Sequence, residues 1–444
     1  MKTDFRKIIG LVLALIMMMA CFSGCSSTPI EASDNNESSE TGSEQVSEQK
    51  VLRVAGESWH ITKLFLEDAA AAFMADHPDV KVEIVTYADT SVLSTYSLDW
   101  ANGSTDVDLV FLDGTLYAQQ FAAKDLIYDW EKDIGFFGNY SADNFVANTI
   151  DFGRVNGSLV LMPVIYEVNG ININLKMFEE AGLIDADGKP MQPETWEDFY
   201  EFAKKLTIKD ANGAIIQQGA SINFGSNLQS TVASALAAYN GRIVGDDGIT
   251  IDFDNEGFRE ILAVWKRGVE DGYFSIETFA DGSAGRNNYK AGNVAMCFES
   301  ASRWMEAAET LGIENVSVLD CPGFKGNCGV TNGVIIPKCT DNVDLAIQFT
   351  QEQLLGEHVQ SQTYEVYGKM SVVKEYYDRV VRGNAIWANL DRGNKNPLTI
   401  PAYEEISRFK DEQKSIIQEG LVNPDKDVDT IINELVEMIN NIRK

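Results

Sequence analysis

The sequence predicts an α/β fold in which helices cover both faces of mainly parallel sheets. Short β-branched runs of strand length alternate with stretches of helical length from residue 51 onward. This repeated β-α-β order is typical of parallel sheets, whose crossover connections place helices on both faces. The 394 residues after residue 50 (444 − 50) are enough for about two or three domains with their own cores. No internal repeat or obvious linker divides this body, so we expect intertwined lobes rather than domains in series.

Strands and helices alternate over the first part of the body. A β-branched strand is expected at Val51–Gly56, followed by a helix at Ile61–Pro78 that its terminal proline stops. Alternating apolar residues predict a strand at Val80–Tyr87. A helical stretch then runs through Trp100, and an apolar strand follows at Val107–Gly114.

The rest of the chain continues this mixture. Residues Gly157–Leu175 contain two β-rich pieces broken at Pro163, and Thr195 is expected to cap an amphipathic helix at Trp196–Leu206. Further along we expect two helices, two strands and a C-terminal amphipathic helix, in the order SNLQSTVASALAAYNG, NEGFREILAVWKRGVEDG, VSVLDCPGF, GVTNGVIIP and VDTIINELVEMINNI.

The first 24 residues have the organisation of a secretory signal. Three basic residues precede an apolar run at Ile8–Phe22, and two small residues lead from it to Cys25. Fifteen residues at 1.5 Å each are too few to cross ~30 Å of hydrocarbon, which argues against a membrane-spanning helix. The tetrapeptide FSGC resembles the lipobox of bacterial lipoproteins, with Phe22 in place of the usual leucine. The resemblance implies that Cys25 is lipidated and becomes the mature N-terminus, held at the outer face of the cytoplasmic membrane by more than one acyl chain.

Residues 25–50 form an expected linker. Serine, glutamate, asparagine and glutamine dominate this stretch, and almost nothing in it can join a core. Such a composition is typical of a disordered, solvated segment. We expect it to hold the folded body clear of the lipid headgroups.

The charge of the chain excludes two kinds of partner. The formal net charge is −31, and removal of residues 1–24, which carry three basic residues and Asp4, leaves −31 − 2 = −33. A chain this acidic repels nucleic acid and anionic headgroups, so we expect neither as a partner. The charge does not identify a ligand.

Neither a metal nor a cofactor is expected. Four cysteines besides Cys25 remain after maturation, Cys297, Cys321, Cys328 and Cys339. A bond between Cys321 and Cys328 would close a small loop, but four cysteines allow three connectivities, so the pairing stays open. With three histidines in the chain and no C-x-x-C, a zinc site is not expected. The segment Asp252–Gly257 imitates the start of an EF-hand loop, but Ala263 stands where the bidentate glutamate is needed, so a helix start is expected there.

Four segments carry a family resemblance. In chain order they are PVIYEVNGININLKMF, AGLIDADGKPMQPETWEDFYEFAKKLT, YKAGNVAMCFESASRW and VSVLDCPGFKG. They resemble stretches of the extracellular solute-binding proteins of sugar-transporting ABC systems, the family that includes the maltodextrin-binding proteins. Ile173 replaces a usual tyrosine, and Cys321 with Pro322 replaces a plain strand end. The similarity runs from Val51 to the last helix and covers essentially the whole mature body.

The resemblance implies the two-lobe, type II periplasmic-binding-protein fold. Each lobe is then a mainly parallel sheet flanked by helices and assembled from discontinuous segments. Lobe 1 would comprise residues 51–165 and 315–350, and lobe 2 residues 166–314 and 351–444. The crossings between the lobes would form a hinge near Ile165, Asn315 and Thr350.

The implied function is capture of a carbohydrate rather than catalysis. Members of this family bind a mono- or oligosaccharide between their lobes and hand it to a separate membrane permease with a cytoplasmic ATPase. We expect a monomer of this kind and no enzyme activity. Two alternatives remain open: the same fold binding a non-sugar solute, such as a polyamine or a phosphorylated polyol, or an exported glycoside hydrolase with a carboxylate pair.

A sugar site combines aromatic platforms with carboxylates, amides and arginine, because a sugar offers flat C–H faces and a ring of hydroxyls. In parallel sheets the ligand lies beyond the carboxyl ends of the strands, where residues just after the first and third strands fall. The resemblance adds the AM…W motif and the chain crossing after Pro163. The expected ligand-binding residues are Trp59, His60, Asp113, Tyr166, Glu167, Arg303, Trp304 and Tyr367.

Each of these residues also has a purely structural interpretation. Trp304 is either the stacking aromatic of its motif or a core tryptophan, and Asp113 either binds ligand or caps the next helix. Glu167 either accepts sugar hydroxyls or forms an ion pair at the hinge. Arg303 either clamps a hydroxyl or extends along the surface, and His60 is either a contact or an ordinary loop histidine.

Overall fold

The computed structural model describes residues 49–88, 91–135, 140–146, 148–225, 227–245, 251–400 and 406–442. The expected signal segment, Cys25 and the linker up to residue 48 lie outside these residues. Within the described part of the chain, no helix has both the length and the apolar character needed to cross a membrane.

Strands from distant parts of the chain form one large mixed sheet. Its main path runs β2-β1-β3-β12-β6-β10-β8-β7, while β4 and β5 form a separate two-stranded hairpin. The strands are β1 (Lys50–Gly56), β2 (Val80–Thr86), β3 (Leu109–Asp113), β4 (Arg154–Val155), β5 (Ser158–Leu159), β6 (Met162–Asn174), β7 (Ile208–Lys209), β8 (Ile215–Ile222), β9 (Phe274–Ser275), β10 (Val294–Ser300), β11 (Val316–Leu319), β12 (Asn327–Ile335), β13 (Met370–Ser371) and β14 (Pro397–Thr399). The pairs β1–β2, β1–β3, β8–β10 and β8–β9 are parallel, as the β-α-β order predicts.

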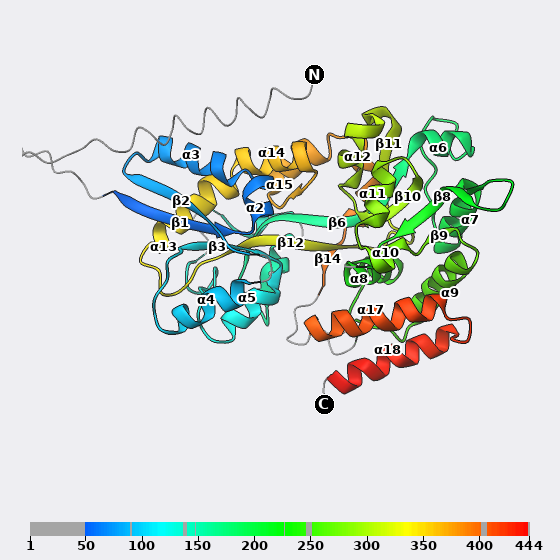
Figure 1. The fold of residues 1–444 in the computed structure, drawn as a ribbon. Helices are drawn as coiled ribbons and strands as arrows, with labels where there is room; N and C mark the ends of the chain where they lie inside the picture. Colours follow the sequence, from blue (N-terminus) through cyan, green and yellow to red (C-terminus); the bar gives the residue numbers. More distant parts are fainter. Residues whose placement is uncertain are drawn as a thin grey trace, which may run out of the picture. The chain divides into compact units, whose positions relative to one another are not determined.

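Helices cover the sheet on both sides (Figure 1). They are α2 (Ser58–Lys63), α3 (Leu66–Asp76), α4 (Val92–Ala101), α5 (Thr115–Ala122), α6 (Leu175–Glu180), α7 (Trp196–Leu206), α8 (Leu228–Asn240), α9 (Glu256–Glu270), α10 (Glu277–Ala280), α11 (Ala284–Lys290), α12 (Arg303–Leu311), α13 (Val343–Phe349), α14 (Glu357–Tyr367), α15 (Lys374–Tyr376), α16 (Asp391–Asn394), α17 (Ile406–Val422) and α18 (Val428–Ile442). Short 3₁₀ turns lie at Ala142–Asn144, Thr149–Gly153, Ile313–Asn315 and Trp387–Leu390, and π-helical turns at Thr350–Leu354 and Tyr377–Val381.

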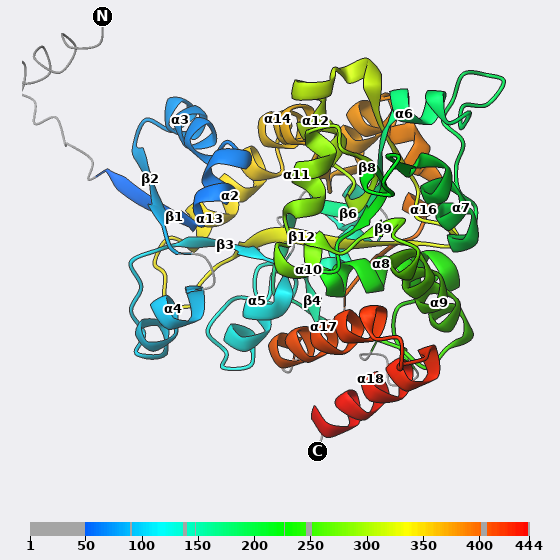
Figure 2. The ribbon, with the colours of Figure 1, turned by 45° about the vertical axis from the view of Figure 1, so that its right-hand side comes forward.

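Two long strands join two halves of the sheet. In β6 the segment 162–168 pairs with β12, while residues 169–174 pair with β10 and β11. Strand β12 pairs in turn with β3 near its end and with β14 near its start. We call the side of β1, β2 and β3 the β1 half, and the side of β8, β9, β10 and β11 the β8 half. Figure 2 shows β6 and β12 running between these halves.

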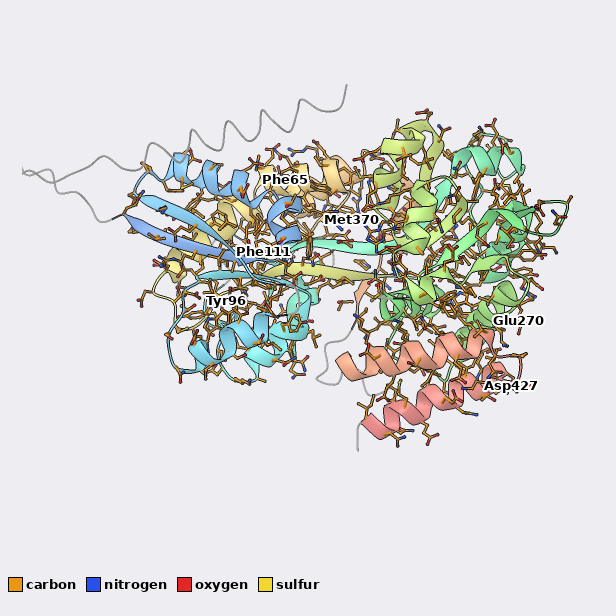
Figure 3. All side chains as sticks on the ribbon, viewed as in Figure 1. Phe65, Tyr96, Phe111, Glu270, Met370 and Asp427 are labelled. Atoms are coloured by element: carbon orange, nitrogen blue, oxygen red, sulfur yellow. The ribbon has the colours of Figure 1, made fainter. Side chains whose placement is uncertain are left out.

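The core is only partly divided along the same line. One cluster of buried side chains belongs to the β8 half and includes Phe178, Trp196 and Trp265. A second cluster lies in the β1 half around Leu52 and Phe73, and it continues along β6 to α12 and β11 of the other half. Figure 3 shows Met370 of β13 where the two halves meet. Met370 pairs in register with Tyr166 of β6. The two halves are therefore joined by one continuous cluster of buried side chains along β6.

Most of the predicted elements are confirmed, and two are corrected. The helix expected at Ile61–Pro78 is two helices, α2 and α3, because Phe65 adopts a left-handed backbone with φ of 52° between them. The break expected at Pro163 is absent, and β6 runs through it. The register of β6 with β12 shifts beside Pro163, and such an irregularity accommodates a residue with no N–H to donate.

Local capping follows the sequence closely. The Thr195 hydroxyl accepts a hydrogen bond of 3.1 Å from the Asp198 N–H at the start of α7, as expected. The Asn255 side chain caps α9 in the same way, accepting from the Phe258 N–H at 2.8 Å, so the segment that imitates an EF-hand is a helix start. The four cysteines considered above all carry free thiols, so no bond joins Cys321 to Cys328.

Candidate functional site

A cavity of about 300 Å³ lies at the junction of the two halves. Residues of α2 and the end of β3 line it from the β1 half, while α8, α11, β10 and α12 line it from the β8 half, with β6 and β12 between them. The lining residues are Trp59, Lys63, Asp113, Glu167, Asn169, Asn227, Ser230, Arg286, Ser300, Arg303, Val330 and Lys369.

A second cavity of about 390 Å³ adjoins the first. The two share four lining residues, Asp113, Asn227, Ser230 and Val330. The second cavity extends past Tyr117 of α5 and Lys410 of α17. Together they form a continuous space, which we call the cleft. Two larger depressions, of about 720 and about 710 Å³, are lined by residues of the β8 half alone, so neither places groups from both halves around a ligand.

Trp59 is the aromatic wall of the cleft. It lies in the first turn of α2, directly after the carboxyl end of β1. Its indole N–H donates a hydrogen bond of 3.0 Å to a carboxylate oxygen of Glu57, and its ring lies 4.0 Å from the His60 ring, centre to centre. These two contacts fix the orientation of the indole, so the cleft has a preformed aromatic surface on one side.

His60 lies behind Trp59 and is fully buried. Its Nδ1 accepts a hydrogen bond of 3.1 Å from the Glu57 N–H, which places the ring proton on Nε2 of the neutral form. Burial lowers the pKa of His60 to about 3. The residue therefore supports Trp59 as a neutral ring and does not line the cleft.

Asp113 stands at the end of β3 with its side chain open to the cleft. The Asn332 amide on β12 donates to its Oδ1. Burial of the site, followed by the charges of Glu167 and Glu57, raises the pKa of Asp113 to about 6. Gly114 next to it has φ of 83°, a conformation open to glycine, and this lets the chain turn from β3 into α5.

Glu167 lies on β6 at the centre of the cleft wall. The Ser300 hydroxyl donates to one of its oxygens at 2.9 Å, and the Lys369 ammonium forms an ion pair with the other. Although burial raises the pKa of Glu167, the charges of Lys369 and Arg303 hold it below its usual range. A carboxylate held in this way is charged at neutral pH and has its position fixed.

Arg303 begins α12 and anchors an ion network at the other wall. Its Nε lies 3.0 Å from a carboxylate oxygen of Glu299, which the guanidinium of Arg286 also contacts at 2.8 Å. Its Nη1 bonds to Glu306. Although burial raises the pKa of Glu306, Arg303 and Lys290 hold it at about 2. The network fixes two guanidinium groups against the cleft.

The structure brings four of the eight expected ligand-binding residues to the cleft: Trp59, Asp113, Glu167 and Arg303. Tyr166, fully buried, packs against Tyr377 on the opposite face of β6 from Glu167, because neighbouring residues of a strand alternate sides. Trp304 is 2% exposed and packs against Trp387. Tyr367 lies beside the cleft, in contact with Phe65 and the Lys63 ammonium.

Eight lining residues were not expected from the sequence: Lys63, Asn169, Asn227, Ser230, Arg286, Ser300, Val330 and Lys369. Lys369 had one signal, since it lies two residues after Tyr367. The amide of Asn169 is held by the hydroxyls of Ser230 and Ser234, at 3.1 and 2.9 Å. No local pattern marks the others, because they meet only through the packing of α2, α8, α11, β6, β10 and β12.

Comparisons with known proteins agree with this architecture. The family model described as bacterial extracellular solute-binding protein matches residues 68–390. Among curated proteins, the lactose-binding protein of Rhizobium radiobacter is 26% identical over 149 residues, which are 32% of this chain and 33% of that protein. The matched stretch thus spans about a third of that relative.

Solved structures resemble the chain over most of its length. The sugar-binding protein MalE of Xanthomonas citri has a TM-score of 0.74 at 14% identity, covering 88% of this chain and 97% of its own. The substrate-binding protein Lmo0181 of Listeria monocytogenes, in complex with cycloalternan, has a TM-score of 0.71 at 16% identity, covering 89% and 99%. Maltose-bound MalE3 of T. maritima has a TM-score of 0.69 at 18% identity, covering 88% and 99%. These likenesses show the two-lobe fold.

Proposed function

Because the chain belongs to the family of bacterial extracellular solute-binding proteins, we propose that it captures an extracellular carbohydrate and delivers it, as a monomer, to a membrane permease with a cytoplasmic ATPase. The observation that carries this proposal is the cleft, where an indole, carboxylates, amides and guanidinium groups from both halves surround one space. These are the groups that a sugar's C–H faces and hydroxyls require. The relatives with lactose, maltose and cycloalternan in their names support a sugar as the ligand.

Hinge closure is the proposed mechanism. A ligand that touches Trp59 on one half and Arg303 on the other favours the closed arrangement over the open one, since its contacts to both halves form only on closure. The permease can then distinguish the closed, ligand-bound receptor from the open, empty one. The chain itself would bend where β6 and β12 pass between the halves.

The strand pairing supports lobe boundaries that differ from those expected near Asn315 and Thr350. Strand β11 pairs with residues 171–174 of β6 and so belongs with the β8 half. Helix α14 packs against α3 and the turn at 350–354, which belong with the β1 half. We therefore place the second crossing within β12 and the third after α14.

Cys25 is the proposed site of lipidation. The signal-like segment and the FSGC motif support an anchor that keeps the receptor at the outer face of the cytoplasmic membrane. We expect a Cys25→Ser variant to appear in the medium or the soluble extracytoplasmic fraction instead of the membrane fraction. Fractionation with an antibody measures this, and a variant that stays in the membrane fraction would contradict the proposal.

The cleft also bears on the alternatives. Four residues that line its 300 Å³ cavity are cationic, which disfavours a polyamine. A glycoside hydrolase would need two carboxylates of different pKa. The pKa of Asp113 is raised and that of Glu167 is lowered, as such a pair requires. Glu167, however, is already occupied by Lys369 and Ser300. Incubation with oligosaccharides followed by chromatography separates the cases, because a receptor binds without releasing product.

A thermal-shift screen against mono- and oligosaccharides tests the proposed function. A ligand at a hundred times its Kd stabilises the folded state by about 2.7 kcal/mol, which raises Tm measurably. In calorimetry with the ligand so found, we expect Trp59→Ala to weaken binding about tenfold or more, or about 1.4 kcal/mol, because the aromatic wall is lost. Trp59→Phe, which keeps a ring, serves as the control. Equal affinity in Trp59→Ala and the unaltered protein would remove Trp59 from the site.

A further inference from the structure

The charge of the cleft is opposite to that of the chain. The sequence has 36 lysines and arginines against 67 aspartates and glutamates. Of the charged side chains that line the 300 Å³ cavity, the cations are Lys63, Arg286, Arg303 and Lys369, and the anions are Asp113 and Glu167. The lining of this cavity therefore carries more cationic than anionic side chains, although the whole chain is strongly acidic.

Part of this positive charge is already neutralised. Lys369 is paired with Glu167, and Arg303 with Glu299 and Glu306 behind the lining. Asp113 adds one carboxylate to the lining.

Two cations retain unused capacity. Among the described residues, no carboxylate lies within ion-pair distance of the Lys63 ammonium, whose recorded contact is the Tyr367 ring at 5.0 Å. Burial lowers the pKa of Lys63, and the charges of Lys369 and Arg303 lower it further against the opposing charges of Glu306 and Glu167. The Nε of Arg286 is buried without a hydrogen-bond partner. An anion in the cavity would offset the repulsion at Lys63, give its ammonium an ionic partner and add a charge beside Arg286, whose other guanidinium contact is with Glu299 at 2.8 Å.

Resting on the proposed carbohydrate function, we infer that the ligand is a sugar that carries a negative charge. The anionic group, a carboxylate as in a uronic acid or a phosphate ester, lies against the cationic lining of the 300 Å³ cavity with Lys63 as its main partner. The neutral part of the sugar lies against Trp59 and the amides of Asn169 and Asn227. The adjoining 390 Å³ cavity offers room for further sugar units.

Calorimetry with matched probes tests this inference. The probes are galactose, galacturonic acid and galactose 6-phosphate, the same set built on glucose, and the neutral and uronic di- and trisaccharides. We expect an acidic probe to bind about tenfold or more tightly than its neutral counterpart, with the preference shrinking as salt is raised. The carboxylate and phosphate arms identify the anionic group.

Variants at Lys63 locate the anion. We expect Lys63→Gln to reduce the acid-over-neutral preference at least about fivefold, while Lys63→Arg keeps most of it. Lys205→Gln on α7, which removes an equal charge from an exposed position outside the cleft, should change nothing. A preference that survives in Lys63→Gln contradicts the assignment of this residue.

The outcomes separate the two proposals. Neutral sugars that bind as tightly as acidic ones, or more tightly, would overturn the anionic ligand and leave carbohydrate capture standing. No binding by any sugar, neutral or acidic, would overturn carbohydrate capture and this inference with it. Tight binding of acidic sugars that is lost in Lys63→Gln supports both.

Discussion

Replacing Trp304 by alanine is expected to lower the free energy of unfolding by about 3–5 kcal/mol, the usual effect of emptying a buried tryptophan site. Trp304 is 2% exposed, its ring lies 5.8 Å from that of Trp387, and its backbone N–H donates to Asn172 at 2.9 Å. It also lies among the side chains that join α12 to the shared core around β6. Urea unfolding followed by circular dichroism measures the loss.

The ligand affinity of folded Trp304→Ala should stay within about threefold of the unaltered protein, because the indole does not line the cleft. Trp304→Phe is the matched control and should lose less stability. Lost affinity with unchanged stability would return Trp304 to the ligand site, the role that its sequence motif predicts.

The second large effect is expected at Arg303. Its side chain is 11% exposed and pairs with Glu299, which is 2% exposed. Removal of one member of a buried pair leaves the other charge without its partner, so Arg303→Met should cost about 3 kcal/mol, the lower end of the usual range because Arg286 still contacts Glu299. Ligand binding should also weaken about tenfold or more, since a residue that lines the cleft is lost.

The control variants distinguish charge from geometry. Arg303→Lys keeps the charge but cannot reach Glu299 and Glu306 together, so we expect intermediate stability. Adding Glu299→Gln to Arg303→Met should recover part of the lost stability, because the stranded carboxylate is then neutral. Equal stability of Arg303→Met and the unaltered protein would show that the network contributes nothing to the fold.

The pH dependence provides a further check on Arg303→Met. Arg303 and Lys290 hold the pKa of Glu306 at about 2, below its ordinary 4.5. A carboxyl with a lowered pKa adds stability that is present above about pH 4.5 and is lost as the pH falls towards 2. Without Arg303 this shift shrinks, so the stability of Arg303→Met should fall less steeply over that range.

The sequence was sufficient for the periodic features of the fold. The strand at Val80–Tyr87, the Thr195 cap and the C-terminal helix all follow from local residue patterns, and the structure confirms each. The helix break at Phe65 was not predictable, because neither glycine nor proline marks it. The continuous strand through Pro163 depends on an irregular register with β12, a partner more than a hundred residues away.

The candidate site divides in the same way. Position after a strand predicts Trp59 and Asp113 as ligand-binding residues, and both line the cleft, since the carboxyl ends of strands meet at one edge. The motif around Arg303 and Trp304 predicts that this helix borders the ligand site. It does not predict which of the two side chains faces the cleft. Helical rotation and packing turn Arg303 to the cleft and Trp304 to the core.

The sequence alone determined the alternation of strands and helices, the signal-like start, the acidic charge and the positions that follow strands. Each of these features depends on composition or on residues close together in the chain. Only the tertiary structure brought Lys63, Arg286 and Lys369 together at one cavity and buried Tyr166, His60 and Trp304 away from it. The reason is physical: which side of a strand or helix faces a ligand depends on what packs against the other side, and those partners lie far away in sequence.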